Sequence, residues 1–167
     1  LSLLASTSAF AQATQYPLTV QSCNRQVIFN KAPEHALSHD INMTQMMLAL
    51  GLRSRMVGYS GVSGWKAVTP ELRKELDGLP ELASKYPSVE TLLNANVDFF
   101  FAGWDYGMRV GGDLTPQTLA PLGIRVYELT EVHRMTKDNF LVQIDILFLG
   151  EKAYATVADR LQTNIGG

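Results

Sequence analysis

The histidines are the residues of this sequence best suited to chemistry. His39 and Asp40 directly follow a short β-prone run, and His133 lies in a loop after a later run of the same kind. Neutral imidazole is a common metal ligand, so His39 and His133 could share a metal ion, with Asp105 or Glu131 as a further ligand. In the competing interpretation these histidines contact solvent or an organic ligand, and Asp40 caps a helix.

Aromatic side chains form a second candidate group. Trp65, Trp104 and Tyr106 all lie in loops that follow expected strands. Aromatic rings at such positions can stack on a planar or apolar ligand. The alternative is that they close the core beneath each loop. Arg134 could pair with an anionic group, or it could simply be solvated.

Signatures of catalysis are missing from the sequence. It contains no G-x-S-x-G elbow, no phosphate-binding P-loop and no H-E-x-x-H motif. The glycines between Gly58 and Gly64 lack the spacing of a dinucleotide-binding loop, and no nucleophile, base and orienting group can be assembled. We therefore expect no enzyme, although an exported α/β hydrolase remains an alternative.

The composition narrows the class of protein further. The 167 residues include 14 Lys and Arg against 16 Asp and Glu, so the formal net charge is −2. This balance argues against a general nucleic-acid binder, which needs a basic face. The hydrophobic fraction of 46% is too high for a disordered chain. The single cysteine, Cys23, excludes an intrachain disulfide and any multi-cysteine metal site.

The elements that would position these residues alternate between strand and helix. One expected helix begins at a cap formed by Asp40 or Asn42 and ends at Gly51. Ser88 caps another. The expected strands are residues 18–21, 26–29, 35–38, 55–59, 98–103 and 124–127, and the expected helices are 40–50, a short one from 69, 88–94, 115–123 and one from about 137. This alternation predicts an α/β fold with an open, mostly parallel sheet flanked by helices.

Ligands of such sheets bind outside the carboxyl ends of the strands. The loops after Ser38, Tyr59, Gly103 and Tyr127 are therefore the expected binding loops. The predicted ligand-binding residues are Ser38, His39, Asp40, Tyr59, Trp65, Trp104, Asp105, Tyr106 and Arg134.

The first residues indicate export. Residues 1–11 are small and apolar and end in Ala-Phe-Ala, the pattern that signal peptidase accepts. We expect a signal peptide remnant over 1–11, cleaved after Ala11 or, as second choice, after Ala13. No run of about 18 apolar residues appears, so no stable membrane insertion is expected.

The order of several segments resembles a known family, the periplasmic substrate-binding proteins of ABC importers for iron–siderophores, cobalamin and haem. The matching stretches are residues 25–34, 46–52 with 55–58, 86–93, 97–103 and 119–127. The resemblance implies two α/β lobes joined by a long helix, with the solute bound in the cleft between them. The chain would then comprise a first lobe over 12–136 and terminal helices over 137–167 that include the start of the linker helix.

The same resemblance implies a function and its partners. The protein would be a periplasmic, monomeric carrier without catalysis or resident cofactor, capturing a metal chelate or cofactor-like solute. It would deliver this solute to an ABC permease with its ATPase. Glu90, in the segment Pro-Ser-Val-Glu, would inherit the role of docking the lobe onto the permease; alternatively it is an acid favoured by the helix macrodipole. A carrier of free zinc or manganese using His39 and His133 is the alternative within the binding class.

Overall fold

The computed structural model describes residues 14–23, 25–103 and 112–128. The predicted signal remnant, the terminal helices over 137–167 and the end of the 12–136 lobe lie outside these residues, so their boundaries stay predictions. Within the described part, no helix is both long and apolar enough to cross a membrane.

The expected strands 18–21 and 26–29 form an antiparallel hairpin, β1 (Leu18–Ser22) and β2 (Arg25–Phe29). Ser22 pairs with Arg25, so the connection is two residues long rather than the four residues that separate the two expected strands. Alternate residues of both strands face inward, and Val20, Val27 and Phe29 join the main core.

A five-stranded parallel sheet forms the centre of the fold, in the order β5-β4-β3-β6-β7. Its strands are β3 (Ala36–His39), β4 (Met56–Ser60), β5 (Glu81–Ala83), β6 (Phe99–Gly103) and β7 (Arg125–Glu128). The predicted α/β class is thereby confirmed. Four of these strands follow the sequence pattern to within a residue or two at each end, which is the usual uncertainty of strand boundaries. The three-residue edge strand β5 was not predicted.

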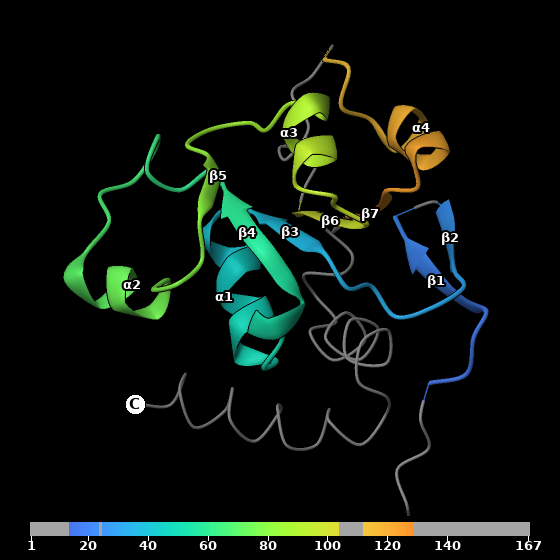
Figure 1. Ribbon diagram of the computed structural model, residues 1–167, viewed down its shortest axis with the longest axis horizontal. Helices are drawn as coiled ribbons and strands as arrows, with labels where there is room; N and C mark the ends of the chain where they lie inside the picture. Colours follow the sequence, from blue (N-terminus) through green and yellow to red (C-terminus); the bar gives the residue numbers. More distant parts are fainter. Residues whose placement is uncertain (1–13, 24, 104–111, 129–167) are drawn as a thin grey trace, which may run out of the picture.

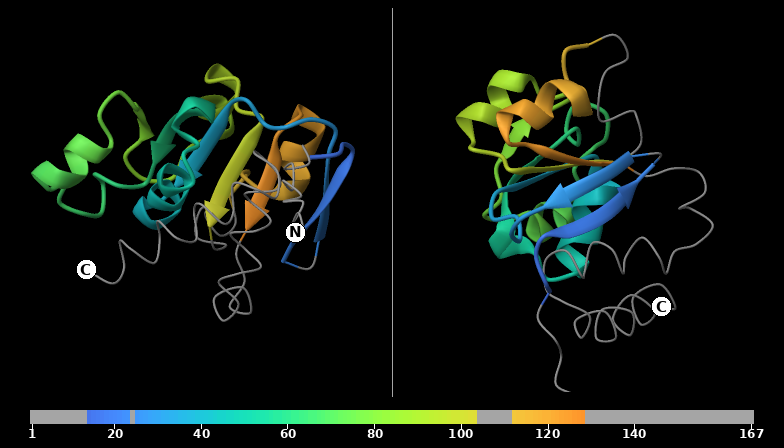
Figure 2. Two further views of the ribbon diagram at one scale, coloured as in Figure 1. Left: turned by 90° about the horizontal axis from the view of Figure 1, so that it is seen from below. Right: turned by 90° about the vertical axis from the view of Figure 1, so that its right-hand side faces the viewer.

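Helices cover both faces of this sheet, giving three layers (Figures 1 and 2). On one face lies α1 (Ile41–Ala49); α3 (Val89–Asn94) and α4 (Pro116–Leu119) cover the other. Short 3₁₀ turns at Arg53–Arg55 and Ala120–Leu122 lead into β4 and β7. Beyond β4 lies α2 (Pro70–Glu75), which begins at the expected Thr69 cap and Pro70.

The continuous apolar run of β6 explains how one strand serves two cores. Phe99 and Phe101 face α1 and pack with Met43 and Met47, and all four are buried. Phe100 faces the opposite side and packs with residues of α3 and α4. A strand buried on both faces needs apolar residues at every position, and this requirement made β6 recognisable.

Candidate ligand-binding site

The carboxyl ends of β3, β4 and β5 bring together the most distinctive side chains of the described residues. His39 ends β3, Ser60 ends β4, and the loops after β4 and β5 carry Trp65 and Tyr86. Because the three strands are parallel, their carboxyl ends meet at one edge of the sheet. Three aromatic rings from three separate segments, those of His39, Trp65 and Tyr86, therefore lie at the edge where the site was predicted.

His39 is the buried member of this group of rings. Its side chain is only 3% exposed, and Nδ1 lies 2.9 Å from the Ser60 hydroxyl. The Ser60 hydroxyl lies 3.4 Å from the Ser38 carbonyl oxygen, to which it can donate. Either group can donate across the Nδ1–Ser60 contact, depending on the tautomer of the imidazole. Burial lowers the pKa of His39 from 6.5 to about 4, and the neighbouring Asp40 charge opposes this only weakly.

A glycine makes room for this imidazole. Gly61 follows β4 with φ +72°, and a Cβ placed there would lie 2.4 Å from Cε1 of His39. No other residue could adopt this backbone so close to the ring without displacing it. The glycines after β4, which the sequence showed only as a generic loop, therefore include one with a defined steric role.

Two exposed aromatic rings cover His39. Tyr86 stacks on the imidazole with centroids 5.5 Å apart and planes 12° apart. Trp65 meets it edge-on at 5.7 Å, and Trp65 and Tyr86 meet each other at 4.9 Å and 72°. Trp65 remains 44% exposed and Tyr86 40% exposed. This cluster, which we call the aromatic triad, presents two ring surfaces to solvent on a buried, uncharged support.

The backbone beneath Trp65 is held to the neighbouring strand and loop. The amides of Gly61 and Gly64 donate to the carbonyls of Ala83 and Ser84, each at 2.9 Å. The Glu81 carboxylate accepts from two further amides of the loop. A surface aromatic group on such a backbone is pre-organised, which reduces the ordering cost of binding.

Asp40 caps α1 and contacts a lysine beside the aromatic triad. Its carboxylate accepts from the Asn42 amide at 3.0 Å, as the capping interpretation predicted. The same oxygen lies 3.7 Å from Nζ of Lys66, which directly follows Trp65. Both side chains are partly exposed, so this pair contributes little to stability. The two charged residues directly follow His39 and Trp65 in the sequence.

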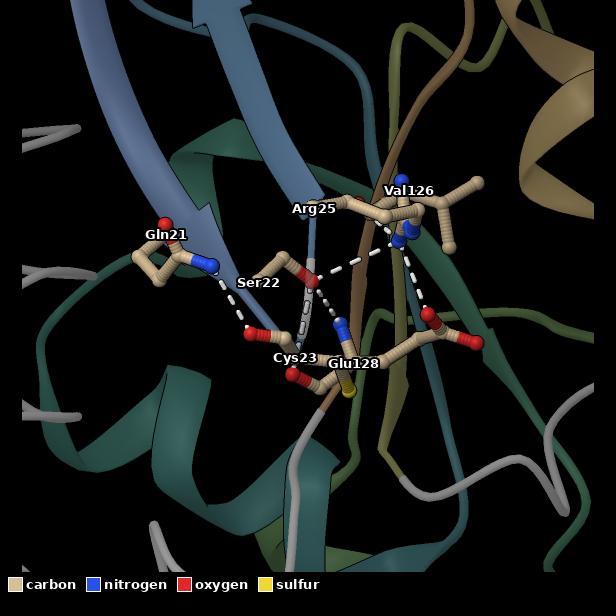
Figure 3. Close-up of polar contacts among 6 residues, drawn as sticks. All are labelled: Gln21, Ser22, Cys23, Arg25, Val126 and Glu128. Carbon is tan, nitrogen blue, oxygen red and sulfur yellow. Dashed lines mark hydrogen bonds and ion pairs between the residues drawn. The ribbon is translucent and has the colours of Figure 1, made fainter.

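A second polar cluster ties the first hairpin to the sheet (Figure 3). The Arg25 guanidinium donates to Oε2 of Glu128 at 2.8 Å, and the Glu128 amide donates to the Ser22 hydroxyl at 2.9 Å. Glu128 ends β7, so this cluster lies at the same carboxyl edge of the sheet as the triad, three strands away from β4. Its charges are paired with each other, which indicates an anchor for the hairpin.

Besides His39, two further predicted ligand-binding residues are buried. The Ser38 hydroxyl is fully buried and lies 2.8 Å from the Thr44 hydroxyl. Tyr59 packs with Ile41, Val62 and Leu76 in a small core beneath the loop. Burial and the Glu81 charge raise the pKa of the Tyr59 phenol. Both positions support the site from below.

Of the remaining predicted ligand-binding residues, some are exposed and others lie outside the residues that the structure describes. Trp65 is the one predicted aromatic residue that the described part exposes at this edge. The following lie outside the described residues and stay predictions: Trp104, Asp105, Tyr106, His133 and Arg134. Within the described ranges, no group of three or more His, Cys, Asp or Glu side chains could hold a metal ion. The His39–His133 metal site is accordingly also still a prediction.

Tyr86 was missed as a site residue. It follows β5, and because that strand was not predicted, residues 84–87 were not assigned to the carboxyl edge. The available signal was its position just before the Pro87–Ser88 start of α3, since helices in such folds begin near the carboxyl ends of the strands.

Glu90 lies exposed in the first turn of α3. The Ser88 hydroxyl accepts from the Thr91 amide at 3.1 Å, and the Thr91 hydroxyl accepts from the Ser88 amide. This capping box holds the first turn rigidly, and the acid at its start is also favoured by the macrodipole. The docking role of Glu90 stays a prediction.

Comparison with solved structures places this architecture among known folds. The chain is similar to a periplasmic binding protein from Veillonella parvula, with 21% identity, a TM-score of 0.68, and coverage of 89% of this chain and 52% of that one. It is also similar to an ABC-type Fe³⁺-hydroxamate transport protein from Saccharomonospora viridis, with 22% identity, a TM-score of 0.62, and coverage of 91% and 55%. A periplasmic haem-binding protein from Vibrio cholerae gives 20% identity, a TM-score of 0.57, and coverage of 81% and 49%.

These similarities concern the fold. No family model and no curated protein sequence matches the chain. The chain spans about half the length of the solved structures it matches, in agreement with the expectation of one lobe from a two-lobe architecture. The chain thus has an α/β fold similar to that of about half of a solved periplasmic binding protein.

Proposed function

We propose that the protein is the periplasmic solute-binding component of an ABC importer. It captures an iron–siderophore, haem, cobalamin or similar metal chelate and delivers it to the permease without catalysing a reaction. The support is the shared fold together with one observation, the exposed aromatic triad at the carboxyl edge of the parallel sheet. Carriers of this fold are expected to bind solute at that edge.

The chemistry of the triad suits a large, partly apolar solute. Trp65 and Tyr86 offer ring faces and edges for van der Waals and stacking contacts. His39 remains neutral near pH 7, so the support beneath the rings carries no net charge. Lys66 and Asp40 at the margin can orient a polar substituent of the solute.

Tryptophan fluorescence of the full-length protein tests this proposal. Ferrioxamine, a ferric catecholate, haemin and cyanocobalamin are titrated separately, each against its metal-free counterpart where one exists. We expect saturable quenching by at least one of them. Trp65→Ala should weaken that binding by about tenfold or more, because buried aromatic contacts carry a large share of binding energy.

Leu93→Ala is the matched control, since Leu93 is similarly exposed but lies on α3. It should leave solute affinity unchanged. Failure of all four solutes to bind would refute the carrier function, and an unchanged affinity in Trp65→Ala would remove the triad from the site.

The exposed Glu90 gives a separate test of delivery. We expect Glu90→Ala to leave solute affinity unchanged but to reduce uptake in cells, because its carboxylate would contact a cationic pocket of the permease. Glu71→Ala, another exposed acid in a first helical turn, is the control. Equal uptake by wild type and Glu90→Ala would exclude the docking role.

A further inference from the structure

We propose that Glu81 is a positioning residue for the binding loop, which we define as residues 61–65. Its carboxylate holds the loop so that Trp65 rests against His39 before solute arrives. This inference rests on the proposed function, because it identifies what orders the aromatic surface that would receive the solute.

One carboxylate oxygen makes the decisive contacts. Oε1 of Glu81 accepts a hydrogen bond from the Val62 amide at 3.0 Å and another from the Ser63 amide at 2.8 Å. Hydrogen bonds to an ionised acceptor are stronger than neutral ones. Since two successive amides converge on a single oxygen, the start of the loop is held in one backbone conformation.

This clamp lies at the base of a turn that carries Trp65. The Trp65 amide donates to the Val62 carbonyl at 3.2 Å, so the residue held by Glu81 also fixes the turn. The Val62 side chain is fully buried in the small core with Tyr59. The backbone that carries the indole is therefore fixed both by the packing of Val62 and by the hydrogen bonds to Glu81.

A second contact holds the far end of the loop. The Gly64 amide donates to the Ser84 carbonyl at 2.9 Å. A Cβ at Gly64 would lie 2.5 Å from that oxygen and 2.5 Å from Cγ of Lys85. Any larger residue at this position must push the loop away from the segment that carries Tyr86, which offers a perturbation independent of Glu81.

A purely structural role is the alternative. Glu81 is the first residue of the short edge strand β5 and pairs with Tyr59, so its loss could weaken the sheet edge alone. The two roles differ in what they change at Trp65. Only the positioning role requires the environment of the indole to change under conditions where the protein stays folded.

Fluorine NMR on the solute-free, full-length protein separates the two roles. The tryptophans are labelled with 5-fluorotryptophan, and the Trp65 resonance is assigned from Trp65→Phe. We expect Glu81→Ala and Gly64→Ala to shift or broaden this resonance. Glu81→Gln should keep it near the wild-type position, because the amide oxygen can still accept both bonds, and Glu71→Ala should not change it.

Titration with haemin and with ferrioxamine is the second measurement. If Glu81→Ala leaves the loop ordered in about a tenth of the molecules, the affinity for the bound probe falls about tenfold, and Glu81→Gln restores most of it. An unchanged Trp65 resonance in Glu81→Ala, or a lowered unfolding midpoint with unchanged resonance and affinity, would overturn the proposal. If wild type binds neither probe, the titration with all four solutes decides the carrier function, while the fluorine spectra still decide the role of Glu81.

Discussion

Protonation of His39 should destabilise the protein strongly in mild acid. The imidazole is buried beneath Trp65 and Tyr86 and bonded to Ser60, and burial lowers its pKa to about 4 in the native state from 6.5 in the unfolded chain. The unfolded chain therefore binds a proton at a higher pH than the native protein does. This contribution to stability is fully present above pH 6.5 and is lost as the pH falls toward 4.

The magnitude follows from the two pKa values. A pKa of about 4 against 6.5 corresponds to about 3 kcal/mol once both states are protonated. At about pH 4.5 the unfolded chain is almost fully protonated at this position while the native protein is only partly so, and the loss is already about 2.5 kcal/mol. For a domain of this size, such a loss is a large fraction of the whole stability.

Urea unfolding at about pH 7.5 and about pH 4.5 measures the effect. The free energy of unfolding should fall between these pH values by about 2.5 kcal/mol more in wild type than in His39→Gln, because glutamine does not titrate. The comparison of pH differences cancels the packing cost of the substitution and the shared titration of the carboxylates. His35→Gln, at an exposed position, should behave as wild type; equal pH losses in wild type and His39→Gln would refute the reasoning.

Two further substitutions test the packing of the lobe. Phe100→Ala should lower the free energy of unfolding by about 3–5 kcal/mol, because it opens a cavity in a fully buried core. Leu93→Ala, at an exposed position, should lower it by less than about 1 kcal/mol. Similar losses of stability in the two variants would contradict the assigned core. Glu128→Ala should cost about 1–3 kcal/mol, because Arg25 loses its closest acceptor and the hairpin its anchor. Glu34→Ala breaks the exposed ion pair with Lys31 and should lower the free energy of unfolding by less than about 1 kcal/mol. Chemical denaturation measures the stability of all four variants.

Much of the fold was predictable because its signals are local. The alternation of the first hairpin, the apolar run of β6 and the Ser88 cap of α3 each depend on neighbouring residues, and each is present in the structure. The edge strand β5 was not predictable in the same way. It has only three residues and no β-branched one, and it becomes a strand because its backbone pairs with β4.

The candidate site was predictable in its position but not in its composition. Strand order implied that ligand-binding loops gather at the carboxyl edge, and Trp65 is exposed there. Ser38 and Tyr59 were singled out for the same reason, yet their side chains support the site from the interior. Periodicity over a four- or five-residue strand does not distinguish a residue near the strand's end that faces the core from one that faces solvent.

By itself, therefore, the sequence determined the class of fold and the elements with local signals, and it predicted the edge of the sheet at which the candidate site lies. The tertiary structure decided which side chains meet there. Tyr86 reaches His39 across 47 positions of sequence, Glu81 reaches Val62 across 19 and Arg25 reaches Glu128 across 103. Such contacts depend on strand pairing and loop closure between distant segments, and no pattern of neighbouring residues encodes them.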